Sequence, residues 1–186
     1  MIEIVSGISS AIGLSTSAGL NAYLPLLVVG LVARYTDLIK LNAPWDMLTN
    51  GWVLAVLAVL LLIEMMADKI PVADTFNDGL QTIGRPLAGA VLFAAGSGIA
   101  GELHPVAAFI AGLLIAGGVH AAKTVIRPVV TAVTAGTGNW LVSLLEDVLS
   151  FIIVVLAILV PLLVIFLVAG LILFTIETWY ARRTGT

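Results

Sequence analysis

Hydrophobic residues occur in long runs that charged residues rarely interrupt. Six runs carry no charge or almost none: residues 4–33, 51–63, 86–101, 105–119, 128–145 and 148–176. A helix that crosses the hydrocarbon core of a bilayer needs about 20 apolar residues. The first and last runs exceed that length, whereas the middle runs reach it only if their charged flanks are included. None shows the alternation of a half-buried strand, so we expect an all-α membrane bundle.

Small and hydroxyl-bearing residues interrupt this pattern at residues 15–21 and again at residues 134–139. The first interruption ends in Asn21 and the second in Asn139. Two interpretations are open for each. It is either a kink packed against small residues, or a broken or re-entrant helix whose exposed backbone groups line a solute site.

Residues 71–84 have a different pattern, in which apolar and polar positions separate onto two helical faces. This pattern predicts a short amphipathic helix that lies on the cytoplasmic surface of the bilayer, with its polar stripe in water. The polar stripe consists of Asp74, Asp78, Gln81 and Arg85.

Composition agrees with a membrane protein that forms one domain over residues 1–186. Hydrophobic residues make up 61% of the chain and charged residues 10%, and the mean hydropathy is +1.18. A soluble domain has about 25% charged residues. A net charge of -3 with eight lysines and arginines leaves no basic face for nucleic acid. There is no cysteine, which excludes disulfides and thiol chemistry, and we expect no cofactor.

The distribution of basic residues predicts an orientation. Six spans place both ends of the chain on one side, and Arg182 and Arg183 make that side cytoplasmic. Only Arg34 and Lys40 then fall outside, against six basic residues inside. We therefore expect a multi-pass protein of the cell (inner) membrane, N-in and C-in, with membrane lipids as its surroundings.

Two groups of ionisable residues near the inner ends of the predicted spans are candidates for a site. Glu64 follows seventeen uncharged residues, and ionisable groups at membrane depth are costly and commonly functional. His120, Lys123 and Arg127 share one helix face, where they could hold a phosphate or serve as interfacial anchors. Both groups fall at the same membrane level, so Glu64 and His120 could form a proton relay.

Four carboxylates are candidate ligands for a metal ion. Oxygen ligands of this kind suit Mg²⁺. The candidates are Glu64, Asp68, Asp74 and Asp78.

Glycine is concentrated between residues 84 and 118. Small residues allow membrane helices to approach closely. We expect residues 84–118 to form a tightly packed helical hairpin, which could alternatively be the interface of a homo-oligomer.

Four stretches together resemble a known family. They are AGLNAYLPLL (18–27), EMMADKIPVAD (64–74), GRPLAGA (84–90) and TAVTAGTGNWLVSLLED (131–147). Their order and spacing are similar to those of the integral membrane family called domain of unknown function 4126 (DUF4126). The resemblance implies a small polytopic membrane protein and carries over no activity and no catalytic residue.

The preferred functional hypothesis is a small transporter or channel for an ion or small solute, with proton coupling, rather than an enzyme. The alternatives are a membrane enzyme or translocase acting on a lipid phosphate or pyrophosphate, and a non-catalytic scaffold. The residues assigned to the transport site are Asn21, Asn139, Glu64, His120, Lys123 and Arg127.

Overall fold

Every regular element in the described part of the chain is helical, as the apolar runs predict. The computed structural model describes residues 2–67, 71–97, 103–135 and 137–161 and the single positions 163, 170, 172 and 174. Its elements are α1 (Ile2–Leu20), α2 (Tyr23–Tyr35), the 3₁₀ turn η1 (Trp45–Thr49), α3 (Gly51–Ala67), α4 (Pro71–Ser97), α5 (Pro105–Thr134) and α6 (Asn139–Leu159).

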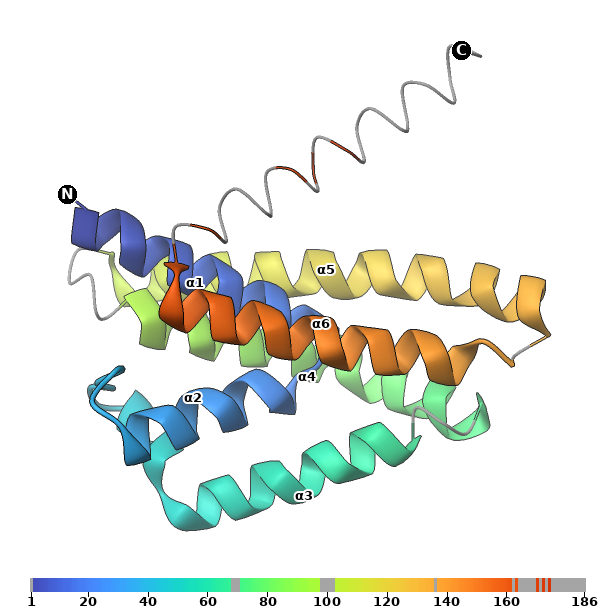
Figure 1. Ribbon diagram of the computed structural model, residues 1–186, viewed down its shortest axis with the longest axis horizontal. Coiled ribbons are helices and arrows are strands. Elements are labelled where there is room, and N and C mark those ends of the chain that lie inside the picture. Colours follow the sequence, from blue (N-terminus) through green and yellow to red (C-terminus); the bar gives the residue numbers. More distant parts are fainter. Residues whose placement is uncertain are drawn as a thin grey trace.

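Helices α3, α4, α5 and α6 run up and down along the long axis of the bundle (Figure 1). We call the end at which α1 begins the proximal end, and the end at which α5 finishes at Thr134 the distal end. Helices α2, α4 and α6 finish at the proximal end, and α3 and α5 finish toward the distal end (Figure 1). Helix α1 packs between α4, α5 and α6.

The first apolar run is divided in two, at the end of the predicted interruption. Helix α1 continues to Leu20, and α2 starts at Tyr23. The two helices run in opposite directions, and their junction lies near the middle of the bundle (Figure 1). Residues 4–33 are therefore a helical hairpin and not one spanning helix. Its two outer ends both lie at the proximal end, which differs from the orientation that we expected from the basic residues.

The second interruption is a turn between two antiparallel helices at the distal end, and not a break within one helix (Figure 1). Ala135 ends α5 in the left-handed conformation, with φ 50°, which is a common way to stop a helix. The hydroxyl of Thr134 then accepts a hydrogen bond from the Gly138 amide (3.1 Å). Residues 134–139 thus connect α5 to α6.

The remaining runs do not match helices one to one. Helix α5 is one continuous helix that contains the run 105–119, the basic residues that follow it, and the start of the run 128–145. It continues through Pro128. Helix α4 likewise continues through Pro86, so residues 71–84 are its first half and not a separate interfacial helix. Gln81 and Arg85 are buried, which corrects the prediction that they face water. Proline removes one helical hydrogen bond, and neighbouring helices stabilise the continuation.

Small residues allow α4 and α5 to pack closely. A Cβ atom on Gly112 would overlap the carbonyl oxygen of Gly89, and a Cβ on Gly89 would overlap the Ala116 side chain. Ser15 of α1 donates a hydrogen bond to the same Gly89 carbonyl (2.8 Å). The predicted tight hairpin over residues 84–118 is therefore formed within the monomer at these positions.

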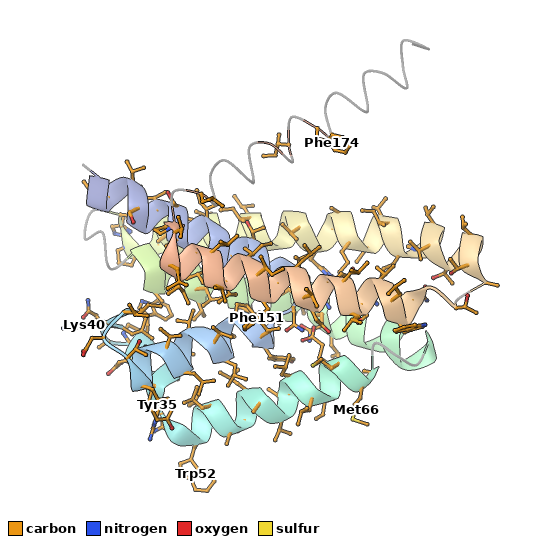
Figure 2. All side chains as sticks on the ribbon, in the orientation of Figure 1. Tyr35, Lys40, Trp52, Met66, Phe151 and Phe174 are labelled. Carbon is orange, nitrogen blue, oxygen red and sulfur yellow. The ribbon has the colours of Figure 1, made fainter. Side chains whose placement is uncertain are left out.

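Large apolar side chains cover the outside of the bundle. Trp52 is 84% exposed and Met66 67% exposed, and both project from α3 away from the other helices (Figure 2). Among the described helices, α5 and α6 have the length and apolar composition to cross a membrane. An apolar exterior on such helices favours a membrane protein.

Candidate functional site

A single asparagine reverses the chain between α1 and α2. The Asn21 side-chain oxygen accepts hydrogen bonds from the amides of Tyr23 (3.1 Å) and Leu24 (2.9 Å), at the start of α2. Its side-chain nitrogen donates to Asp147 Oδ1 on α6 (2.8 Å). Amides in the first turn of a helix lack partners within it. Asn21 therefore supplies those partners and anchors the tip of the hairpin to α6.

The end of α1 meets a buried cation from α5. Lys123 Nζ donates to the Leu20 carbonyl oxygen (3.3 Å), and a cation is favourable beside the partly negative C-terminus of a helix. The same Nζ contacts Glu146 Oε2 (2.8 Å), which also accepts from Arg127 Nη2 (2.8 Å). One carboxylate oxygen of α6 thus holds two cations of α5.

A second group of ionised side chains lies between α3, α4 and α5. Arg85 Nη2 donates to Glu64 Oε1 (3.0 Å), and its Nη1 is 3.0 Å from His120 Nδ1. Because a guanidinium can only donate, Nδ1 is the acceptor, and the His120 proton lies on Nε2, which is 3.3 Å from the Thr82 hydroxyl. Glu64 and His120 therefore meet through Arg85.

The two groups are adjacent, because His120, Lys123 and Arg127 lie on one face of α5 at successive turns. The described side chains of these groups include three cations and three carboxylates around His120. We call this assembly the charge cluster. Its members are Asn21, Glu64, Arg85, His120, Lys123, Arg127, Glu146 and Asp147.

The charge cluster is buried, and its exposure increases toward α6. The side chains of Arg85 and Glu64 are 0% and 1% exposed, whereas Arg127 is 9% and Glu146 is 13% exposed. Charges inside a low-dielectric interior are costly even when they are paired. Water therefore reaches the carboxylate of Glu146 more easily than that of Glu64, the other ion-paired acid.

Asn139 lies away from the charge cluster. It occupies the first position of α6 at the distal end, where its Oδ1 accepts from the Thr131 hydroxyl (3.0 Å). Asp147 lies eight residues along α6, or about 12 Å at 1.5 Å per residue. Asn139, which the sequence analysis assigned to the same transport site as Asn21, thus lies apart from Asn21, because the second interruption is a turn at the end of the bundle.

Polar residues nevertheless connect Asn139 to the charge cluster along the facing sides of α5 and α6. Ser143 is buried one turn before Glu146, and Thr131 lies one turn beyond Arg127. We call Thr131, Asn139 and Ser143 the polar seam. On the proximal side of the charge cluster, Ser17 and Ser150 share a hydrogen bond (2.7 Å), and beyond them Leu14, Leu92 and Val154 form an apolar core.

Among the described residues, no group of three or more histidine or acidic side chains is arranged to hold a metal ion. Glu64 is bound by Arg85 instead. Asp68 lies outside the described residues, and so do the side chains of Asp74 and Asp78.

Sequence reasoning identified five members of the charge cluster and missed three. The sequence analysis placed Arg85 in a polar stripe that faces water, and it did not assign Glu146 and Asp147 to the site. The structure places the two acids within α6, where one meets α5 and the other meets Asn21. The sequence did contain a signal for the two acids of α6, because Glu146 and Asp147 are the only charged residues between 139 and 176. Their buried partners explain why they do not end the helix.

The chain belongs to the family described as domain of unknown function (DUF4126), whose model matches residues 8–181. This agrees with the resemblance of the four sequence stretches. No curated protein and no solved structure matches the chain.

Proposed function

We propose that this protein is a small transporter or channel that moves an ion or small solute across the cell (inner) membrane. The observation that carries the proposal is the charge cluster, buried half-way along the bundle at the tip of the α1–α2 hairpin. Discontinuous helices that expose backbone groups near the membrane centre commonly form solute sites. Ionised side chains at that depth commonly mark the path of an ion or proton.

The proposed placement sets the long axis of the bundle across the bilayer. Helices α3 to α6 then cross the membrane, and the α1–α2 hairpin enters from the proximal side and returns to it. Helix α5, with 30 residues, is about 45 Å long and exceeds the roughly 30 Å hydrocarbon core. Over residues 2–161 this placement differs from the single spans that the apolar runs suggested, and most of the last run beyond residue 161 lies outside the described residues.

Access in this proposal comes from the distal side. The polar seam supplies hydrogen-bonding groups between α5 and α6, and it leads from Asn139 to the more exposed part of the charge cluster. The apolar core beyond Ser17 and Ser150 closes the proximal side. Such an arrangement suits a site that is open to one side of the membrane at a time.

Glu64, Arg85 and His120 form a hydrogen-bonded chain beside this path. We expect purified protein in proteoliposomes to carry solute, and the substitutions Glu64→Gln and His120→Ala to reduce the flux. His104→Ala is the matched control, because His104 is an exposed histidine at the start of the same helix as His120. Wild-type flux in both cluster variants would remove this chain from the mechanism.

One further observation favours an amphiphilic substrate as a second candidate. An apolar groove of about 320 Å³ lies between α2, η1 and α4 and is lined by Tyr23, Leu26 and Leu87, among others. Its lining includes Ala22 and Gly84, the sequence neighbours of Asn21 and Arg85. A lipid phosphate could place its chain in the groove and its head group toward the charge cluster.

The amphiphile candidate is tested by filling the groove. Leu87→Trp should lower the lipid retained by the purified protein in native mass spectrometry, and Leu114→Trp on the exposed face of α5 should not. Equal retention in both variants would count against the groove as a lipid site. A role as a homo-oligomeric scaffold stays a proposal. The same native mass spectra test it, because they also show the oligomeric state of the protein.

A further inference from the structure

The charge cluster contains an internal carboxylate that occupies the position of a bound anion. Glu146 Oε2 accepts from Lys123 Nζ and Arg127 Nη2 at 2.8 Å each. Ammonium and guanidinium groups arranged around one oxygen are the usual recognition elements for a carboxylate or another small anion. If Glu146 loses its charge, Lys123 and Arg127 lose the negative charge that both of them contact.

The groups around Glu146 determine what its protonation would do. Lys123 and Arg127 face it from α5, and Arg85 of α4 acts on Lys123. Asp147 is the next residue on α6 and is held by Asn21 of the hairpin. Glu64 of α3 is paired with Arg85. One proton added to Glu146 removes one negative charge from beside Lys123 and Arg127.

We infer that the charge cluster binds a small monovalent anion together with one proton, with Glu146 as the proton carrier and Lys123 and Arg127 as the anion ligands. The inference rests on the proposed transport function and names its substrate class. A proton binds Glu146 and the anion takes its place between the two cations. The occupied cluster then has the same net charge as the empty one, so the transport step is electroneutral symport of one proton and one anion.

Geometry supports Glu146 over the other ion-paired acid as the carrier. Glu146 is 13% exposed and Glu64 is 1% exposed, and Ser143 of the polar seam lies one turn before Glu146 on α6. An anion arriving along the polar seam therefore meets Arg127 and Lys123 first.

The test uses the full chain in proteoliposomes, with chloride and nitrate as anion probes, rubidium as a cation probe, and a dye for internal pH. An inward gradient of one pH unit should sustain about tenfold anion accumulation, because one pH unit is worth 1.36 kcal/mol per proton. Proton uptake should equal anion uptake, and a membrane potential clamped with potassium and valinomycin should not change the rate.

Variants separate the proton carrier from the anion ligands. Glu146→Gln should still exchange anions but lose accumulation driven by the pH gradient. The double variant Glu146→Gln/Lys123→Gln removes a cation and an anion together and should abolish anion exchange. Asp37→Asn changes an exposed acid outside the charge cluster and should behave as wild type. Heat stability in detergent should rise with nitrate at neutral pH in Glu146→Gln, and only at acidic pH in the wild type.

The outcomes distinguish this inference from the proposed function. Rubidium flux without anion flux would overturn the anion site while transport stands. Proton-driven accumulation that persists in Glu146→Gln would overturn Glu146 as the carrier. Absence of flux for all three ions, with no stabilisation by nitrate, would overturn the inference together with the proposed transport of ions.

Discussion

At the scale of the residue, the fold depends on a few polar side chains that each serve two elements. Asn21 holds the start of α2 through its oxygen and α6 through its nitrogen. Lys123 joins the end of α1 to Glu146. Each contact satisfies a group that would otherwise be buried without a partner, which costs about 1–3 kcal/mol for a neutral group.

We predict that Asn21→Ala lowers the free energy of unfolding by about 1–2 kcal/mol, because two amides of α2 lose their acceptor. Asn21→Asp retains an acceptor for these amides but brings a second carboxylate beside Asp147. Thermal unfolding in detergent measures both variants. If capping is the main effect, Asn21→Asp is the milder change at acidic pH; equal losses at all pH values would contradict that assignment.

We predict a larger loss for Glu64→Gln, of about 3–5 kcal/mol, because Arg85 keeps its charge and remains buried. The double variant Glu64→Leu/Arg85→Met removes both charges and should be closer to wild type than Glu64→Gln. The same unfolding measurement compares them. A double variant less stable than Glu64→Gln would show that the ion pair stabilises the bundle beyond the cost of its burial.

At the scale of the element, the apolar pattern predicted helices correctly but not where they end. Charged residues at positions 120–127 and 146–147 divide the apolar runs in the sequence, yet α5 and α6 continue through them. The reason is that these charges are paired across helices, so the helix does not need to reach water at those positions. Residues 134–139, by contrast, end a helix through backbone conformation, which a run of apolar residues does not reveal.

Glycine positions provide a test of helix packing. We predict that Gly112→Ala lowers stability by about 1–3 kcal/mol or more, because the added methyl overlaps the Gly89 carbonyl of α4. Gly118→Ala on the same helix has open space around its Cβ, and it should be neutral or gain up to about 1 kcal/mol from helix propensity. Loss of stability in both variants to the same extent would contradict this packing.

At the scale of the whole molecule, the reversal at Asn21 decides the orientation of the first 50 residues. Both outer ends of the α1–α2 hairpin lie at the proximal end, together with the start of α5 (Figure 1). Lys40 and Tyr35 are also at this end (Figure 2). The distribution of basic residues alone had placed the N-terminus and Lys40 on opposite sides of the membrane.

Labelling with a membrane-impermeant maleimide tests this topology directly, because the natural chain has no cysteine. We predict that Lys40→Cys and Leu103→Cys react from one side of the membrane and Thr137→Cys from the other. A tag added before residue 1 should be accessible from the same side as Lys40→Cys. If that tag and Lys40→Cys were on opposite sides, α1 and α2 would not form a hairpin in the membrane.

The sequence by itself determined the helical class, the apolar exterior, the position of the first break and five residues of the charge cluster. These properties follow from local periodicity and from the cost of placing charges in an apolar run. Only the tertiary structure decided that Arg85 joins Glu64 to His120, that Glu146 and Asp147 enter the core, and that Asn139 lies at the distal end. Each of these depends on which helices pack together across long sequence separations, and the spacing of residues along one helix carries no information about its partner.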